Sequence, residues 1–309
     1  MNKQRPSVFT CVLLMFAGLT LQILTGFTLA EAASPTINAY DAGSATALRA
    51  RHDELRERIA NNAFQRPLVL ESSQTSKDVK GDVYAVVPHA FSIVSGALAG
   101  SQSWCDILIL HLNTKYCKTA QSPNGTELIM NVGKKFDQPL ADSFRLTFAW
   151  KLVDHQPDYM RVLLRADAGP LGTHDYRITL EATPLENGQT FVHLSYAYGF
   201  GITGNLAMAA YFNTIGRDKV GFTVTGMDND GKPEYVDGMR GLVERNTMRY
   251  HLAVESYLGA LSLQPPAQFE KRIKDWFLAV ERYPRQLHEM EQTQYLEMKR
   301  KENARQQAG

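Results

Sequence analysis

The two cysteines in the segment WCDILILHLNTKYC, residues 104–117, are the side chains whose spacing most restricts the chemistry they can perform. Two thiols in an oxidising compartment usually form a disulfide. One continuous strand would place Cys105 and Cys117 roughly 40 Å apart, whereas bonded cysteines have Cα atoms within about 7 Å. A helix rises only ~1.5 Å per residue. We therefore expect a helix from Trp104 to about Leu112, then a turn that returns Cys117 to Cys105 as a disulfide.

Two patterns could bind a metal, and both lack ligands. His111 alone between the cysteines does not complete a zinc site. The segment MDNDGKPEYVD resembles part of a calcium loop, but Gly226 would occupy its first ligand position and Asp237 its last. Asp230 and Gly231 instead predict a hairpin turn. The sequence therefore predicts no metal and no other cofactor.

Acid–base catalysis needs a titratable group on the apolar side of the fold, and the sequence offers few and no clear candidate. His193 and Glu181 alternate onto the polar face of their strands. His174 and Asp175 are adjacent, so on a strand they point to opposite faces. Gly-x-Ser-x-Gly, His-Glu-x-x-His and phosphate-loop motifs do not occur in the sequence. We assign no catalytic residue, and enzyme activity stays open, with the sequence favouring its absence.

Arginines form the densest polar clusters. In RGLVERNTMRY, the spacing of Arg240 and Glu244 suits an i,i+4 ion pair, and Arg245 and Arg249 repeat it. This pattern indicates either a solvated helix face or an arginine that holds an anionic group at the mouth of a pocket. The chain has 33 Lys and Arg against 32 Asp and Glu, so no basic surface indicates nucleic-acid binding. On the polar strand faces we expect neighbouring acidic residues to neutralise four more arginines: Arg145, Arg161, Arg165 and Arg177.

The first residues indicate export. Lys3 and Arg5 precede an uncharged, mostly apolar stretch over 8–30, and Ala30-Glu31-Ala32 has the small-x-small pattern of a signal-peptidase site. We expect residues 1–32 to be a cleaved signal peptide and the rest to be periplasmic. The alternative is an uncleaved inner-membrane anchor, because the apolar stretch approaches the ~20 residues that span a bilayer.

Hydrophobic periodicity then defines the elements. Residues 44–62 predict an exposed amphipathic helix, and residues 83–87 a strand that Pro88 ends. Between 126 and 200 the period is two, which predicts an antiparallel meander with one apolar and one polar face. The apolar rows of this meander are Phe144, Leu146, Phe148, Trp150 and Leu152; Met160, Val162 and Leu164; Tyr176, Ile178 and Leu180; and Val192, Leu194, Tyr196 and Tyr198.

Helical periodicity returns after Gly204. The segment 205–215 is apolar nearly all round, and a long helix follows from Gly238 with an apolar stripe. Pro265 and Pro266 end this unit, and residues 267–309 predict two charged helices interrupted at Pro284.

The order of strand, short helices, antiparallel strands and long helix, with GDVYAVVPHAF and WCDIL at its start, resembles the helix-grip fold of the START and Bet v 1-like (SRPBCC) superfamily. The resemblance implies an α+β fold in which a curved antiparallel sheet wraps a long helix. We expect residues 33–78 to form an N-terminal helix and lead-in strand. A helix-grip domain follows over 79–262, with an insertion at 204–238, and a helical extension over 263–309.

The resemblance also implies a cavity for an apolar molecule or lipid between sheet and helix. The residues that we expect to line it are Trp104, Phe148, Trp150, Tyr176, Tyr196, Tyr198, Thr247, Arg249 and Tyr250. The first hypothesis is a periplasmic binding or carrier protein for a hydrophobic ligand. The alternatives are an enzyme of the cyclase or hydrolase kind, and an envelope protein with a self-filled core that contacts a partner or a membrane surface through 204–216 or 267–298.

Overall fold

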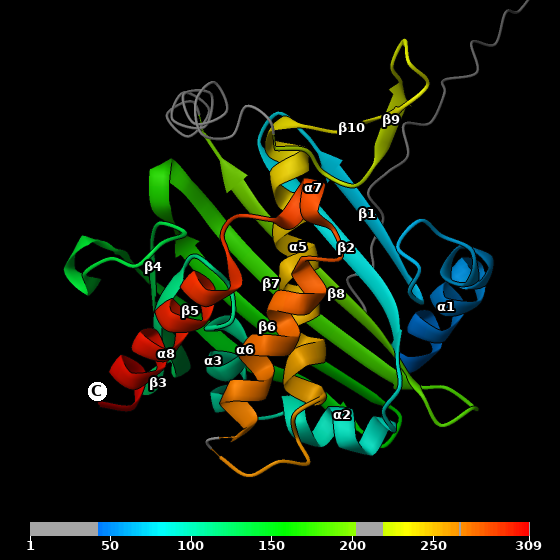
Figure 1. Ribbon diagram of the computed structural model, residues 1–309. Helices are drawn as coiled ribbons and strands as arrows, with labels where there is room; N and C mark the ends of the chain where they lie inside the picture. Colours follow the sequence, from blue (N-terminus) through cyan, green and yellow to red (C-terminus); the bar gives the residue numbers. More distant parts are fainter. Residues whose placement is uncertain (1–42, 202–218, 266, 309) are drawn as a thin grey trace, which may run out of the picture. The chain divides into compact units, whose positions relative to one another are not determined.

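The computed structural model describes residues 43–201, 219–265 and 267–308. Its main feature is an eight-stranded antiparallel sheet with the strand order β1-β2-β8-β7-β6-β5-β4-β3 (Figure 1). The strands are β1 (Leu68–Gln74), β2 (Asp78–Val87), β3 (Thr114–Ser122), β4 (Gly125–Val132), β5 (Phe144–Gln156), β6 (Tyr159–Ala168), β7 (Thr173–Pro184) and β8 (Thr190–Phe200).

The helices lie mainly on one face of this sheet. Helix α5 packs against β1, β2 and β8, and α3 packs beside it against β3 and β4. This is the predicted α+β helix-grip fold, a curved antiparallel sheet around a long helix (Figure 1). The helices are α1 (Ala45–Ala60), α2 (Phe91–Leu98), α3 (Ser101–Leu108), α5 (Gly238–Leu258), α6 (Ala267–Val280), α7 (Pro284–Leu287) and α8 (Gln292–Ala308).

Alternation along the strands produces the core. In β5, Leu146 and Phe148 are buried while Arg145 and Thr147 are exposed. Phe144 was expected in the buried row, but 41% of it is exposed, because it begins the strand at the end of the sheet. The predicted hairpin is present as β9 (Val224–Met227) and β10 (Pro233–Tyr235).

The disulfide prediction is confirmed. Helix α3 ends at Leu108, the chain turns, and β3 begins at Thr114, so that Cys105 and Cys117 are bonded with their Cα atoms 5.3 Å apart. The helix is shorter than expected, because the chain after Leu108 already reverses to enter the β3–β4 hairpin. The sequence reasoning had not identified that hairpin.

The outer face of the sheet, opposite α5, is partly covered by α1. Leu48, Leu55 and Ile59 of α1 join a second core with Tyr84 and Phe191. Ser44 caps this helix by accepting a hydrogen bond from the backbone N–H of Ala47 at 3.1 Å. The amphipathic helix is therefore a packing element of the domain, and β1, the predicted lead-in strand, is an edge of the same sheet.

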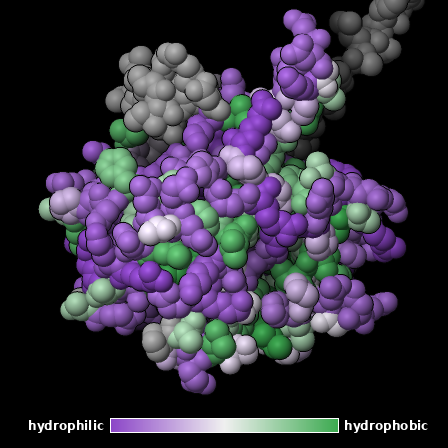
Figure 2. Space-filling model, in the orientation of Figure 1, coloured by the Kyte–Doolittle hydropathy of each residue, from purple (hydrophilic) through white to green (hydrophobic). Residues whose placement is uncertain are grey.

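The C-terminal extension packs on the domain. Most of its large apolar side chains belong to the core, with Leu278 as an exposed exception, and the face above α6 is largely hydrophilic (Figure 2). The expectation that 267–298 presents an apolar working surface is therefore wrong, because the helices turn that face inward; segment 204–216 lies outside the described residues. The buried residues of the extension are Ile273, Trp276, Phe277, Val280, Leu287, Tyr295 and Met298.

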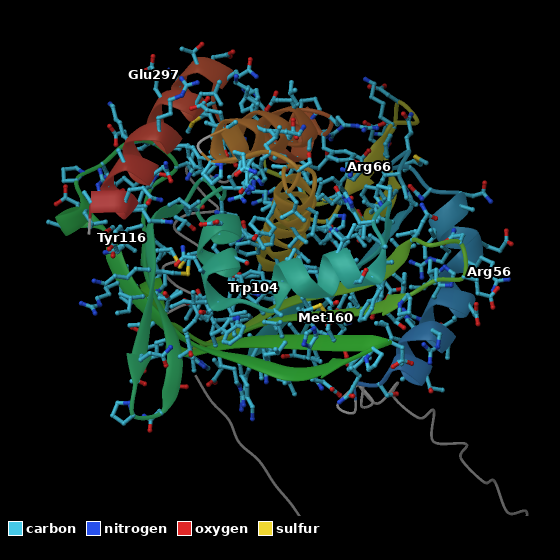
Figure 3. All side chains as sticks on the ribbon, turned by 90° about the horizontal axis from the view of Figure 1, so that it is seen from below. Arg56, Arg66, Trp104, Tyr116, Met160 and Glu297 are labelled. Atoms are coloured by element: carbon cyan, nitrogen blue, oxygen red, sulfur yellow. A yellow bond between two sulfur atoms is a disulfide. The ribbon has the colours of Figure 1, made fainter. Side chains whose placement is uncertain are left out.

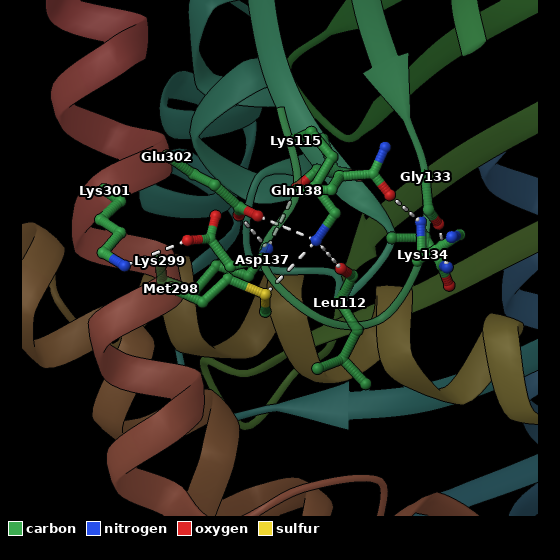
Figure 4. Close-up of polar contacts among 12 residues, drawn as sticks. Leu112, Lys115, Gly133, Lys134, Asp137, Gln138, Met298, Lys299, Lys301 and Glu302 are labelled. Carbon is green, nitrogen blue, oxygen red and sulfur yellow. Dashed lines mark hydrogen bonds and ion pairs between the residues drawn. The ribbon is translucent and has the colours of Figure 1, made fainter. Parts of the chain in front are cut away.

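Three fully buried charges hold α8 against β3 (Figure 4). The Nζ of Lys115 donates to Glu302 Oε1 at 2.9 Å, and the Nζ of Lys299 donates to Glu302 Oε2 at 2.6 Å. Lys299 also donates to the carbonyl oxygens of His111 and Thr114 at 2.7 and 3.1 Å. These bonds therefore connect the extension to the turn before β3 and to the first residues of β3. Within the described ranges, no helix is both long and apolar enough to cross a membrane.

Candidate functional site

Five aromatic side chains, which we name the aromatic cluster, lie between the sheet and α5. Adjacent rings are in contact: the centroids of Tyr176 and Tyr198 are 5.2 Å apart, those of Tyr196 and Tyr198 5.5 Å, and those of Tyr196 and Tyr250 5.2 Å. Phe148 meets Tyr176 edge-on at 6.4 Å. Four of these residues face inward because of strand alternation, and α5 contributes Tyr250. The sequence identified all five.

The phenols of this cluster stay protonated. Burial raises the pKa of Tyr196 well above its ordinary value, and it raises the pKa of Tyr198 and Tyr250 as well. The hydroxyl of Tyr176 is 2.7 Å from Thr173 Oγ1, within hydrogen-bond distance. The other three hydroxyls form no hydrogen bond with any described residue. They are neutral polar groups at an otherwise apolar interface.

Two nitrogen donors belong to the same region. The Nε1 of Trp150, which lies two residues along β5 from Phe148, is buried without a partner in the described chain. His111 stacks on Tyr250 with the ring centroids 4.9 Å apart. Its Nδ1 accepts a hydrogen bond from the backbone N–H of Asn113 at 3.2 Å, so Nε2 carries the proton. This Nε2 forms no hydrogen bond of standard geometry with a described residue, although the side chain of Asn246 is close enough to raise the pKa of the imidazole.

The imidazole of His111 is neutral. Burial lowers its pKa well below the ordinary value, and the neighbouring cations Arg249 and Lys299 lower it further. The Nε2–H of a neutral imidazole can donate a hydrogen bond to a ligand oxygen. The sequence reasoning considered His111 only as a metal ligand. The sequence around His111, in the turn after α3, does not indicate that this side chain contacts α5.

Three other predicted site residues, Trp104, Thr247 and Arg249, form contacts that hold parts of the fold together. The indole N–H of Trp104 donates to the carbonyl of Leu98 at 3.0 Å, which joins α3 to α2 (Figure 3). Thr247 donates to the carbonyl of Val243 at 2.7 Å, and it lies so close to Gly81 that a Cβ there would be 2.3 Å from its Oγ1. These contacts place Trp104 and Thr247 in tight packing.

Arg249 is directed towards the C-terminal extension. Its Nη2 donates to the carbonyl of Leu287 at 3.2 Å and to Glu289 Oε1 at 2.8 Å. Glu289 also accepts from Lys135 at 2.6 Å. Burial and the nearby Arg249 lower the pKa of Lys135 to about 8. Burial opposes ionisation of Glu289, yet Arg249 and Lys135 outweigh it and lower the pKa of that carboxyl. Arg249 therefore holds the loop after α7.

Two hollows on the described surface lie away from α5, which lines neither of them. One, of about 430 Å³, lies at the outer face of β3, β4 and β5 beside the end of α8. The other, of about 830 Å³, lies mainly on the outer face of β4–β7 and is lined by charged side chains. The cavity expected between sheet and α5 is not one of these two, and contacting aromatic rings occupy part of that interface.

A chain of buried polar groups crosses the outer face beneath α1. His193 Nε2 is 2.8 Å from Asp82 Oδ1, and its Nδ1 is 3.0 Å from Glu181 Oε2. The hydroxyl of Tyr159 donates to Glu181. Burial opposes the charge on His193, but the two carboxylates outweigh it and raise its pKa. The sequence placed His193 and Glu181 on this outer face, although it did not predict that α1 buries them.

The expected neutralisation of the sheet arginines holds for Arg161, which is opposite Glu181 and helps to lower the pKa of that carboxyl. It is wrong for the other three. Arg145, Arg165 and Arg177 are exposed on the outer face and form no ion pair within 4.0 Å in the described part of the chain. Arg165 and Arg177 are directly opposite each other in the β6–β7 pair. The strand register places like charges side by side, an arrangement that destabilises a sheet unless anions neutralise it.

Neither a protein-family model nor a curated protein sequence matches this chain. Norcoclaurine synthase from Thalictrum flavum, a Bet v 1-like protein, is similar in structure with 15% identity and a TM-score of 0.32, covering 45% of this chain and 86% of that one. Human StAR-related lipid transfer protein 5 has 8% identity and a TM-score of 0.29, covering 55% of this chain and 88% of that one.

These two proteins are of the START and Bet v 1-like kinds that the sequence resembles. The strand order and the packing of α5 on the sheet give the helix-grip fold that this resemblance implies. The class of protein is thus a helix-grip domain. At these identities and TM-scores the similarity does not identify a ligand or a reaction.

Proposed function

We propose that this protein binds a hydrophobic, lipid-like molecule between the sheet and α5, in contact with the aromatic cluster. One observation carries the proposal. Five neutral polar groups face this apolar interface. The indole N–H of Trp150 and the Nε2–H of His111 are buried and form no hydrogen bond of standard geometry with a described residue, and the hydroxyls of Tyr196, Tyr198 and Tyr250 lie beside them.

The chemistry of these groups defines the ligand class. A buried donor without a partner costs about 1–3 kcal/mol, so a native fold rarely keeps two of them, Trp150 Nε1 and His111 Nε2, in one region without a ligand or ordered water. Because all five groups are neutral, they suit an apolar molecule with a few hydroxyl or carbonyl oxygens. Aromatic rings supply the apolar contact area.

The same proposal places the ligand outside the cytoplasm. The apolar N-terminal stretch and the small-x-small site at Ala30 and Ala32 support export to the periplasm. A disulfide between Cys105 and Cys117 is compatible with an oxidising compartment. A periplasmic protein with an apolar interior could carry a lipid-like molecule through an aqueous space.

One observation favours the alternative, an envelope protein with a self-filled core. The rings of the aromatic cluster contact one another, and Thr247 packs tightly on Gly81, so the protein's own side chains fill part of the interface. Under this alternative, ordered water satisfies the five polar groups, and the fold needs no ligand.

Organic extraction of protein purified from its native periplasm, followed by mass spectrometry, separates the two proposals. We expect a stoichiometric apolar molecule from the wild type and less of it from the double variant Tyr196→Phe/Tyr198→Phe, which loses two hydroxyls. The control is Tyr235→Phe in the β9–β10 hairpin, outside the helix-grip interface. An empty wild-type extract, or equal amounts from the cluster variant and wild type, contradicts the binding role proposed for the cluster.

A further inference from the structure

The smaller hollow, which we name the basic hollow, lies on the outer face of the sheet at the β3 edge. It measures about 430 Å³, and three cationic side chains border it: Lys118, Arg145 and Arg305. Its remaining wall is mainly apolar, with Tyr116, Ile129 and Leu140. The volume is in the range of sites that hold small molecules.

Strand register places the wall residues on one face. Tyr116 is opposite Asn131, and Asn131 is opposite Arg145, so this row crosses β3, β4 and β5. Lys118 is opposite Ile129 in the next row of the same face. The intervening residues of these strands face α3 and the core. The basic hollow and the aromatic cluster are therefore on opposite faces of the sheet.

The end of α8 closes the third side. The side-chain Oε1 of Gln306 accepts a hydrogen bond from the backbone N–H of Cys117 at 3.2 Å. Arg305 donates to the carbonyl of Lys115 at 3.4 Å. Tyr116 lies beneath α8 at this edge of the sheet (Figure 3). Two contacts to β3 thus fix the last turn of α8 beside the hollow.

Charge distinguishes the basic hollow from its neighbour. None of its lining residues is acidic, and Lys118, Arg145 and Arg305 form no ion pair in the described part of the chain. The larger hollow shares Arg145, but carboxylates such as Glu127 and Asp167 also line it. Three cations from β3, β5 and α8 thus converge where no described carboxylate neutralises them.

We propose that the basic hollow binds an anionic molecule with a ring or a short apolar chain, whose carboxylate, sulfonate or phosphate group lies among Lys118, Arg145 and Arg305. Charge-assisted hydrogen bonds from a lysine and two arginines hold the anionic group. The apolar part lies against Tyr116, Ile129 and Leu140. This site is independent of the helix-grip interior.

Two fluorescent probes with related ring systems test the proposal in the full chain. 8-Anilino-1-naphthalenesulfonate carries a sulfonate, whereas N-phenyl-1-naphthylamine is its neutral counterpart. We expect Lys118→Gln and Arg145→Gln each to weaken sulfonate-probe binding by about 3- to 10-fold, because each removes a partly solvated cation. Their double variant should lose at least tenfold, with the affinity for the neutral probe unchanged. Rising NaCl concentration should weaken wild-type binding of the sulfonate probe.

The matched control is Lys151→Gln, an exposed cation on the same face of β5 that does not border either hollow. Thermal unfolding of each variant verifies that the fold is intact. Sulfonate-probe affinity of the double variant within twofold of Lys151→Gln, or equal losses for both probes, overturns the proposal.

Competition for the bound sulfonate probe identifies the source of the anion. Displacement by octanoate supports a free amphiphilic acid, and displacement by phosphatidylglycerol vesicles supports a membrane-borne phosphate. Displacement by neither contradicts the ligand class.

Discussion

Replacing Glu302 by Gln tests the electrostatic argument for how the C-terminal extension is held. The Glu302 carboxylate accepts hydrogen bonds from Lys115 and Lys299, and all three side chains are fully buried (Figure 4). The variant keeps the size of the side chain and removes its charge. It leaves two buried ammonium groups without a carboxylate within 4.0 Å in the described part of the chain.

The magnitude follows from the burial of these charges. Burial lowers the pKa of Lys299 from 10.5 to about 8, even though Glu302 opposes this effect. At ~1.36 kcal/mol per pH unit, holding Lys299 charged in the folded state costs about 3 kcal/mol near pH 7. Removing one partner of a buried ion pair typically costs 3–5 kcal/mol. We expect Glu302→Gln to lower the free energy of unfolding by about 3–5 kcal/mol at pH 7.

The loss must also depend on pH. The folded pKa of Lys299 is below its unfolded value, so between about pH 8 and 10.5 the unfolded chain binds more protons and stability rises with pH from this group. Without Glu302 the folded pKa falls further, and the deprotonated lysine no longer needs a carboxylate. The cost of Glu302→Gln should therefore be smaller at pH 9.5 than at pH 7.

Urea unfolding followed by far-UV circular dichroism at pH 7 and pH 9.5 measures both quantities. The control is Glu297→Gln, an exposed carboxylate on the same helix, which should change stability by less than about 0.5 kcal/mol at either pH. A cost of less than ~1 kcal/mol for Glu302→Gln at pH 7, or the same cost at both pH values, refutes this reasoning.

Two further predictions concern the sheet. His193→Gln removes the cation between two buried carboxylates. Because the pKa of His193 is raised in the folded state, the charged imidazole contributes its full stabilisation below pH 6.5, the ordinary pKa of histidine. That stabilisation is lost as the pH rises through the folded pKa. Urea midpoints should show a larger loss at pH 6 than at pH 8.5, and equal losses argue against a charged His193. Gly81→Ala places a Cβ 2.3 Å from Thr247 Oγ1, so it should lower stability by about 1–3 kcal/mol, with partial recovery in Gly81→Ala/Thr247→Ala. Chemical denaturation measures both variants, and an unchanged midpoint for Gly81→Ala contradicts the close packing of α5 on β2.

Much of the fold follows from local pattern. The period of two along residues 144–200 identifies the strands, and the length of the apolar helical stripe identifies α5. The disulfide follows from the length of the segment, because one straight strand would hold Cys105 and Cys117 too far apart, whereas a helix followed by a reversal can bring them together. These features depend on neighbours in the sequence, and the sequence carries them directly.

The sequence predicted the aromatic cluster for the same reason. Tyr196 and Tyr198 are two residues apart on one strand, so their shared face is a local property. The partners of His111 are not local. It meets Tyr250 because the turn after α3 lies beside α5, and a single sequence carries no distance between these segments.

The sequence by itself determined the class of most elements, though not the β3–β4 hairpin, together with the two faces of the sheet and the disulfide, since periodicity and chain geometry fix them. Tertiary structure alone decided which charged groups are buried. Glu302 looks like a solvated residue of a polar helix, and His193 looks like an exposed residue of a strand, until α8 and α1 cover them. It also decided that Lys118, Arg145 and Arg305 converge, because strand pairing and the docking of α8 join positions far apart in the chain. Burial and charge proximity arise from such long-range contacts, and for this reason local pattern does not contain them.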